Sequence, residues 1–266
     1  MVVSRQWHWP EYLCEAAALG VFMIAASICA VVIEHPESAV RQAIGDPTLR
    51  RLLMGLAMGG TAIAIIYSPM GARSGAHMNP STTLAFARLG KIAPRDAAAY
   101  VVAQCAGAGA GVVIASVALS PWLAHASVNY VATVPGPAGP SAAFAAELII
   151  AFVLMHVVLA LANSRHAKLT GLAAGSLVAL YILVEAPVSG MSLNPARSLA
   201  PALLAGTVDS LWIYLIAPVA DMALAAEVHV RRGGRSLVPC AKLNHAGSSP
   251  CIFRCRMSPL AARRAA

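Results

Sequence analysis

One short polar pattern occurs twice in this chain, each time between long apolar stretches. Residues 74–81 read SGAHMNPS and residues 189–196 read SGMSLNPA. Both copies contain Ser-Gly, three further residues, Asn-Pro and a small residue. Asn-Pro normally marks a turn in water, because proline neither continues a helix nor donates a backbone hydrogen bond. A chain that repeats this turn inside apolar surroundings needs a fold that accommodates polar backbone within a membrane.

The composition places the chain in a lipid bilayer. Of its 266 residues, 59% are hydrophobic and 11% are charged, and the mean hydropathy is +0.71. Soluble domains carry about 25% charged residues. Apolar runs of about 20 residues, long enough to cross a bilayer, occur at 12–33, 51–69, 96–119, 141–162, 170–187 and 210–229. We therefore expect an all-α membrane protein with six transmembrane helices, whose first run is a span rather than a cleavable signal peptide.

The distribution of the basic residues predicts the topology. The formal net charge is +8. If the N-terminus is cytoplasmic, 15 of the 19 Lys and Arg residues fall in cytoplasmic segments, and the exceptions are Arg41, Arg50, Arg51 and Arg197. This bias follows the positive-inside rule and predicts that both termini are cytoplasmic. The basic tail is then explained by topology and lipid headgroups, without a nucleic-acid partner.

The two copies of the pattern divide the chain into related halves. Residues 1–11 form the N-terminus, 12–125 the first three-span repeat, 126–140 an extracytoplasmic linker, 141–230 the second repeat and 231–266 a basic cytoplasmic tail. Because three is an odd number, the second repeat enters the membrane from the opposite face. Such inverted repeats are common in membrane transport proteins.

Each Asn-Pro pair predicts the start of a short re-entrant helix, over 79–89 and 194–204. Asn suits the N-cap and proline suits the first helical position. Ten residues give a helix of about 15 Å, so two half-helices that enter from opposite faces match a hydrocarbon core of about 30 Å. Their N-termini are expected to meet at the midplane.

This geometry predicts a polar path through the centre. The residues of the two motifs are Asn79, Pro80 and Ser81 in the first and Asn194, Pro195 and Ala196 in the second. Each Asn oxygen is expected to cap its own helix, which leaves the amide N–H groups to donate to a solute oxygen. The two positive helix ends repel protons and other cations.

Four charged or titratable residues near the motifs are further candidates. Arg197 adds a permanent charge near the outer mouth, and an arginine inside a membrane favours a functional role, although it also suits a loop anchor. His77 is compatible with orienting its loop and with lining the path. Glu15 and Glu147 occupy matching positions in the two halves, and we expect them to accept hydrogen bonds from the loop backbone rather than to carry protons.

At these residues the chain resembles the major intrinsic protein family, the aquaporins and aquaglyceroporins. The resemblance covers residues 10–230 and includes both Asn-Pro motifs, Arg197, the paired glutamates and Tyr100-x3-Gln104-x2-Gly107. It implies six tilted helices and two half-helices around one pore, in a homotetramer. It also implies a passive channel, not an enzyme, for water or small uncharged solutes such as glycerol, urea or neutral metalloid acids. The expected location is a bacterial inner (plasma) membrane.

The resemblance also assigns an outer constriction. Counting from the two Asn residues places Gly59, Ile182, Met191 and Arg197 at the family's four filter positions. Water-selective members commonly carry Phe where this chain has Gly59 and His where it has Ile182. The substitutions imply a wider and less polar gate, similar to plant nodulin-like and uncharacterised bacterial members.

Two further interpretations remain open from the sequence. Cys240, His245, Cys251 and Cys255 form a C-x4-H-x5-C-x3-C array in the tail. These residue types suit Zn²⁺ or another thiophilic metal, but the spacing matches no standard finger, and the alternative is a disordered basic tail without a metal. The alternative to a channel is a secondary transporter with broken helices, which needs an ion-binding cluster among acids such as Glu15, Glu147 and Asp221.

Overall fold

The computed structural model describes residues 6–162, 164–233, 238–246, 251–253 and 255. Within these residues six helices are long and apolar enough to cross a membrane, which confirms the predicted number of spans. The long helices are α1 (Trp9–Glu34), α3 (Pro47–Tyr67), α6 (Pro94–Leu119), α7 (Pro140–Ala162), α8 (Thr170–Val184) and α11 (Leu211–Gly233). The short helices are α2 (Ala39–Ala43), α4 (Pro69–Ser74), α5 (Pro80–Arg88), α9 (Ala186–Ser189), α10 (Pro195–Ala205) and the 3-10 turns Trp122–Ala124, Asn129–Val131 and Ala167–Leu169.

Proline and its capping residues explain where the spans depart from the apolar runs. The second span begins earlier than predicted, at Pro47, because Asp46 caps it by accepting a hydrogen bond of 2.6 Å from the Thr48 N–H. It ends at Tyr67 because the Ser68 side chain caps the following helix α4. The fifth span ends at Val184, not 187, since the chain turns there and Pro187 lies at the start of α9.

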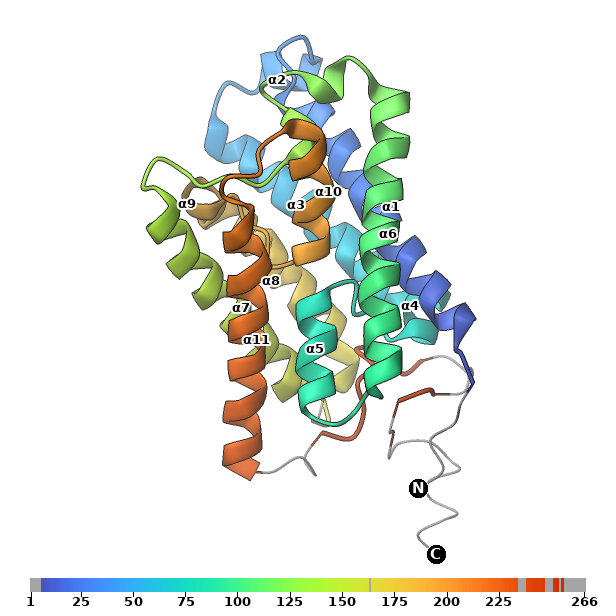
Figure 1. The fold of residues 1–266 in the computed structure, drawn as a ribbon. Helices are drawn as coiled ribbons and strands as arrows, with labels where there is room; N and C mark the ends of the chain where they lie inside the picture. Colours follow the sequence, from blue (N-terminus) through green and yellow to red (C-terminus); the bar gives the residue numbers. More distant parts are fainter. Residues whose placement is uncertain (1–5, 163, 234–237, 247–250, 254, 256–266) are drawn as a thin grey trace, which may run out of the picture.

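The six long helices surround the two half-helices, and the start of α1 lies at the same end of the bundle as the end of α11 (Figure 1). We call this end, where α1 begins and α11 ends, the terminal end, and we call the other the opposite end. The half-helix α5 occupies the terminal half of the bundle and α10 the opposite half (Figure 1). These two helices correspond to the two re-entrant segments predicted from the Asn-Pro motifs.

Small residues allow two pairs of long helices to approach closely. A Cβ atom on Gly107 of α6 would lie 2.0 Å from the Ala16 carbonyl oxygen of α1. In the related pair, a Cβ atom on Gly59 of α3 would lie 2.5 Å from the Gly175 carbonyl oxygen of α8. Close approach at small residues is typical of membrane helices, because packing rather than hydrophobic exclusion holds them together.

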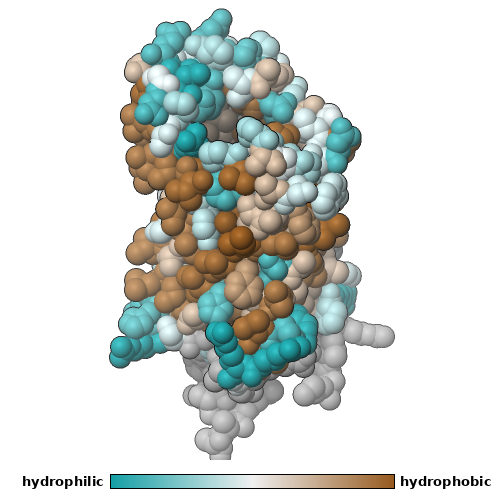
Figure 2. Space-filling model, turned by 90° about the vertical axis from the view of Figure 1, so that its left-hand side faces the viewer, coloured by the Kyte–Doolittle hydropathy of each residue, from teal (hydrophilic) through white to brown (hydrophobic). Residues whose placement is uncertain are grey.

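The outer surface is apolar around its middle. Figure 2 shows a broad hydrophobic band between hydrophilic ends on the face that it presents. Large apolar side chains are exposed on each of the long helices; examples are Leu13, Leu56, Val117, Ile149, Leu180 and Leu224. A surface of this kind belongs in lipid, so the chain is a multi-pass membrane protein.

The described part of the tail packs against the terminal end of the bundle. Val238, Cys240 and Ala241 are each at most 2% exposed, and Phe253 is 5% exposed. The segment contains neither helix nor strand among its described residues. The interpretation of the tail as disordered is therefore wrong for these residues, because they bury apolar side chains and form hydrogen bonds to the bundle. The remainder of the tail lies outside the described residues.

Candidate functional site

A cavity of about 340 Å³ passes between the two Asn-Pro loops. Its lining extends from Glu34 and Arg51 near the opposite end to Ile66 and Leu243 near the terminal end. Residues 76–79 and 190–194 of the two loops form its middle. The cavity is therefore continuous across the level at which the half-helices meet.

Each motif Asn caps its own helix and also reaches the other loop. The Asn79 Oδ1 atom accepts from the Ser81 N–H at 2.8 Å, and Asn194 Oδ1 accepts from the N–H groups of Ala196 and Arg197. The Asn79 amide donates to the Leu193 carbonyl at 2.7 Å, and the Asn194 amide donates to the Met78 carbonyl at 2.6 Å. The prediction that the amides are free to donate into the path is thus only half right. An amide NH₂ group has two hydrogens, and this crossed pair of bonds uses one of them.

Glu15 and Glu147 support the backbone of the two loops through hydrogen bonds. The Glu15 carboxylate accepts from the N–H groups of His77 and Met78 at 3.0 and 2.7 Å. The Glu147 carboxylate accepts from the N–H groups of Ser192 and Leu193 at 2.6 and 2.8 Å. Both glutamates are fully buried, and each also accepts from a loop serine hydroxyl. This geometry agrees with backbone support, because the carboxylates provide acceptors that the membrane interior does not.

The loop backbone that these bonds support is strained in the same way twice. Ala76 and Met78 have φ values of 56° and 48°, and Met191 and Leu193 have 56° and 60°. Left-handed backbone is unfavourable for side chains of this kind. The matched strain explains why each loop needs several acceptors on rigid helices to hold it open.

A second matched pair of supports was missed at the sequence level. Tyr100 of α6 donates its hydroxyl to the Ser74 carbonyl at 2.7 Å, and Tyr214 of α11 donates to the Ser189 carbonyl at 2.6 Å. The sequence pattern Tyr100-x3-Gln104 places both residues on α6. The Gln104 amide donates to the Glu15 carboxylate at 2.7 Å. The recurrence of Tyr at equivalent places in the third and sixth spans was the available signal.

His77 is held by its own half-helix and by the tail. Its Nδ1 atom lies 3.0 Å from Thr83 Oγ1, and its Nε2 atom lies 2.9 Å from the Ala241 carbonyl oxygen. The ring stacks on Phe86 and Phe253, with centroid distances of 5.1 and 5.3 Å. His77 is among the cavity-lining residues, but both ring nitrogens have partners, which favours the orienting role.

Three of the four predicted filter residues line the cavity, and Gly59 does not. Ile182, Met191 and Arg197 lie on its wall. Gly59 faces Gly175 of α8 instead, and Met58, its neighbour in the chain, lines the cavity. The sequence-based prediction for Gly59 therefore differs from its place in the structure, because two glycines let α3 and α8 pack at this level. At this level of α3 the residue on the cavity wall is Met58.

Arg197 lies close to the linker between the halves. Its Nη1 group donates to the Thr133 hydroxyl, which also accepts from the Ser198 hydroxyl at 3.2 Å. Thr133 is 4% exposed. The arginine thus anchors the linker to α10 and also lies on the cavity wall, so both roles considered for it occur together.

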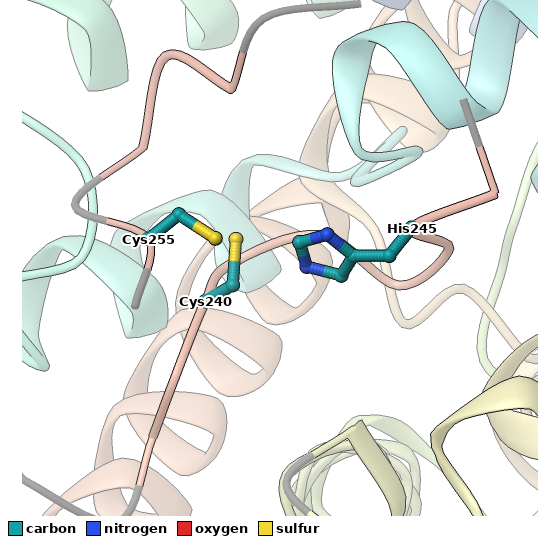
Figure 3. A group of neighbouring side chains, drawn as sticks. All are labelled: Cys240, His245 and Cys255. Atoms are coloured by element: carbon teal, nitrogen blue, oxygen red, sulfur yellow. The ribbon is translucent and has the colours of Figure 1, made fainter. Parts of the chain in front are cut away.

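The Cys- and His-containing part of the tail forms a compact cluster. The ligand atoms of Cys240, His245 and Cys255 all lie within 4.8 Å of one another (Figure 3). The Cys251 sulfur lies 3.5 Å from that of Cys240. This contact is the main cause that lowers the pKa of Cys251 to about 6 and raises the pKa of Cys240. Cys251 therefore carries the thiolate of the pair at neutral pH, which is the form that binds metals.

Four consecutive tail residues join this cluster to the bundle. Each forms a hydrogen bond to the segment that leads into the first Asn-Pro loop or to that loop itself. These bonds are Ala241 O to His77 Nε2 at 2.9 Å, Lys242 Nζ to Ala72 O at 2.7 Å, Leu243 N to Gly75 O at 3.0 Å and Asn244 Nδ2 to Ile66 O at 3.0 Å. The tail thereby lies across the terminal end of the cavity.

Within the part of the chain that the structure describes, no cluster of acidic side chains of the kind that a transporter needs for ion binding is present. Among the described residues, the tail cluster is the one group of three or more His, Cys, Asp or Glu side chains close enough to share an ion. Glu185, a further buried acid that the sequence interpretation overlooked, lies directly after α8. The geometry around Glu15 and Glu147 is that of backbone support.

The fold and the site together define a class: multi-pass membrane proteins in which two inverted halves bring two Asn-capped half-helices together beside a continuous cavity. Comparison with known families agrees, since the family described as "Major intrinsic protein" matches residues 2–229. The chain belongs to the major intrinsic protein family.

Individual relatives are aquaporins of plants. The chain is 36% identical over 191 residues to Aquaporin NIP1-3 of Oryza sativa subsp. japonica, and this match covers 71% of the chain and 62% of the relative. It is 34% identical over 195 residues to Aquaporin NIP1-1 of Arabidopsis thaliana, again covering 71% of the chain and 62% of the relative. The chain thus spans somewhat less than two thirds of these relatives.

A solved structure has the same fold. The chain superposes with a TM-score of 0.66 on the X-ray structure of the aquaglyceroporin from Plasmodium falciparum, covering 84% of this chain and 96% of that one at 20% identity. At this identity the likeness establishes the fold and leaves the transported solute open. The fold class predicted from the sequence is confirmed.

Proposed function

We propose that the protein is a passive channel for water and small uncharged solutes that excludes protons and other ions. The observation that carries the proposal is the crossed pair of Asn79 and Asn194 bonds on the wall of a continuous cavity. Membership in the major intrinsic protein family and the similarity to plant aquaporins support it.

In this mechanism each Asn keeps one amide hydrogen for the oxygen of a passing molecule. The bond to the opposite loop fixes the orientation of the amide, so the remaining hydrogen needs no reorganisation when a molecule arrives. The N-termini of α5 and α10 face this point with their positive ends, and Arg197 adds a full positive charge nearer the opposite end. Cations therefore meet an electrostatic barrier, whereas neutral molecules exchange hydrogen bonds with water for hydrogen bonds with the wall.

The solutes are proposed from the shape and polarity of the wall near Arg197. Ile182, Met191 and Met58 contribute apolar side chains to the cavity wall, which also carries the Arg197 donor. Such a combination suits small molecules that carry hydroxyl or amide groups, such as glycerol, urea and neutral metalloid acids, as well as water. The flexible Met side chains set the width, because Met adapts to irregular space.

Assembly and orientation belong to the same proposal. We place both termini in the cytoplasm, on the bias of the basic residues, and we propose a homotetramer with one pore in each subunit, as the family resemblance implies. The relatives named above come from plants. They give no support to the expectation of a bacterial inner membrane.

Stopped-flow light scattering of proteoliposomes tests the function. The purified protein should give osmotic shrinkage faster than protein-free liposomes, with a low activation energy and without any Na⁺ or H⁺ gradient. Repeating the assay with glycerol, urea and neutral metalloid acids identifies the solutes. Flux that saturates and follows an imposed ion gradient would contradict the channel and favour a transporter.

A further inference from the structure

The tail forms part of the cavity wall at the terminal end. Leu243 is 7% exposed and forms part of the cavity lining, and its N–H donates to the Gly75 carbonyl at 3.0 Å. Gly75 directly precedes the left-handed segment of the first Asn-Pro loop. Whatever fixes the tail in this position therefore also limits access to the path.

The described tail has no helix or strand that would fix it by itself. Short segments without regular structure or a large core usually need a cross-link, either a disulfide or a structural metal. The tail places three thiols and one imidazole together, from positions spread over 240–255. A disulfide between two of these cysteines would leave the other cysteine and the histidine unexplained, and structural disulfides are rare in the cytosol.

We propose that Cys240, His245, Cys251 and Cys255 bind one Zn²⁺ ion, and that the bound ion holds residues 241–244 across the terminal end of the cavity, so that the metal-loaded protein conducts less. The closure rests on the proposed channel function, whereas the metal site does not. Binding requires no redox step: Cys240 and Cys255 each lose a thiol proton to solvent, Cys251 binds as the thiolate described above, and His245 binds through a neutral ring nitrogen.

The geometry of the cluster fits a tetrahedral site. Zinc–sulfur bonds of about 2.3 Å at tetrahedral angles separate two sulfurs by about 3.8 Å. The Cys240 and Cys251 sulfurs lie 3.5 Å apart, and the ligand atoms of Cys240, His245 and Cys255 lie within 4.8 Å of one another. In Figure 3 the Cys255 sulfur and the His245 ring both point toward Cys240. Cys251 joins this group of three through its contact with Cys240, so the four side chains lie in one region of the tail.

The charge and the ligand type favour Zn²⁺. Three thiolates and one neutral imidazole around a divalent ion leave a net charge of −1, and Lys242 lies two residues from Cys240 to balance it. Thiolate and imidazole ligands select Zn²⁺ over the hard ions Mg²⁺ and Ca²⁺. Cys240 is 2% exposed, and an ion with four protein ligands has no open position of the kind that a catalytic zinc centre keeps for water.

The first experiment measures the site in the full-length protein. After chelation, titration with Zn²⁺ should load one ion per chain, and Co²⁺ should give the thiolate charge-transfer and visible bands of a tetrahedral complex. Cys251→Ser should weaken binding by at least about a hundredfold, since even residues outside the ligand shell cost about 10–100-fold. Cys29→Ser, in α1, is the matched control and should bind as the unmodified protein does. Absence of stoichiometric binding would overturn the proposal.

The second experiment measures closure with the same preparation. Shrinkage of proteoliposomes should slow when Zn²⁺ is added to the chelated protein and recover with chelator, and His245→Ala combined with Cys251→Ser should abolish this response. Leu243→Gly should retain the ion but lose most of the slowing, because it removes the side chain in the cavity. Zinc binding without any effect on flux would overturn the closure. Flux no faster than in protein-free liposomes, with or without Zn²⁺, would contradict the channel function and with it the closure, while the titration still decides the site.

Discussion

Asn79 and Asn194 each use the two ends of one amide group for different purposes. The oxygen caps the residue's own half-helix, and the nitrogen donates to a carbonyl of the other half. Each residue therefore ties the two repeats together at the point where their helices meet. This division of the amide makes the Asn side chain irreplaceable by its closest isostere, aspartate, which has no hydrogen to donate at neutral pH.

We predict that Asn194→Asp weakens the exclusion of cations. The carboxylate loses the bond to the Met78 carbonyl and places a negative charge beside the path. A unit charge 4 Å from a cation contributes about 4 kcal/mol at an effective dielectric constant of 20. Cation conductance in planar bilayers should therefore rise above that of the unmodified protein. Asn129→Asp, in the 3-10 turn Asn129–Val131, is the control. If the Asn194→Asp variant excluded cations as well as the unmodified protein does, the proposed barrier would be contradicted.

A second prediction separates Met58 from Gly59. Met58→Ala should increase the flux of glycerol or urea relative to water, because it removes a side chain from the cavity wall. Gly59→Phe should instead lower the yield and the melting temperature of the purified protein, because even its Cβ atom would lie 2.5 Å from the Gly175 carbonyl oxygen. The ratio of solute flux to water flux checks the prediction for Met58→Ala, and a thermal melt in detergent checks the prediction for Gly59→Phe. A stable Gly59→Phe channel with selectively reduced solute flux would restore Gly59 to the filter.

At the scale of elements, the spans and half-helices could be predicted because they follow from local rules. Apolar length determines the six spans, and Asn followed by Pro determines the starts of α5 and α10. The direction in which a residue faces does not follow from these local rules. The position of Gly59 depends on how closely α3 approaches α8, and this approach depends on a second glycine more than one hundred residues away.

The supports of the loops show the same limit. Glu15 and Glu147 were predictable, because buried carboxylates near a polar loop need donors and the loop needs acceptors. The tyrosine pair offers only the recurrence of Tyr in the third and sixth spans as a signal, and the tail contacts offer none, because a backbone carbonyl partner leaves no pattern in the sequence. The bond from His77 to Ala241 joins residues that no local rule relates.

We predict that Tyr100→Phe and Tyr214→Phe destabilise the protein equally and additively. Each removes one hydroxyl that donates to a loop carbonyl, and the buried carbonyl left without a partner costs about 1–3 kcal/mol. The two tyrosines support different loops and share no partner in these bonds. The decrease in the free energy of unfolding of the double variant should therefore equal the sum of the decreases of the two single variants. Denaturation of the purified variants measures this. Strong coupling between the two would contradict the separate support of each loop.

At the scale of the whole molecule, the inverted repeat has a consequence for regulation. Two halves with three spans each return the chain to the face from which it started, so α1 begins and α11 ends at the terminal end of the bundle (Figure 1). The tail therefore reaches only one mouth of the path, next to the first Asn-Pro loop. The second loop, with Arg197, faces the opposite end. The proposed selection near Arg197 and the proposed closure by the tail are thus separated along the path by the pair of Asn residues.

The orientation decides which compartment the tail senses, and it is open to a direct test. The basic residues predict a cytoplasmic terminal end. In chelated inside-out vesicles, a thiol reagent that does not cross membranes should therefore label the tail cysteines, whereas right-side-out vesicles should show no such labelling. Ala126→Cys, in an exposed loop at the opposite end, should show the reverse once the tail cysteines are replaced by serine. Labelling of the tail in right-side-out vesicles would contradict the predicted topology. The metal of the proposed closure would then come from outside the cell.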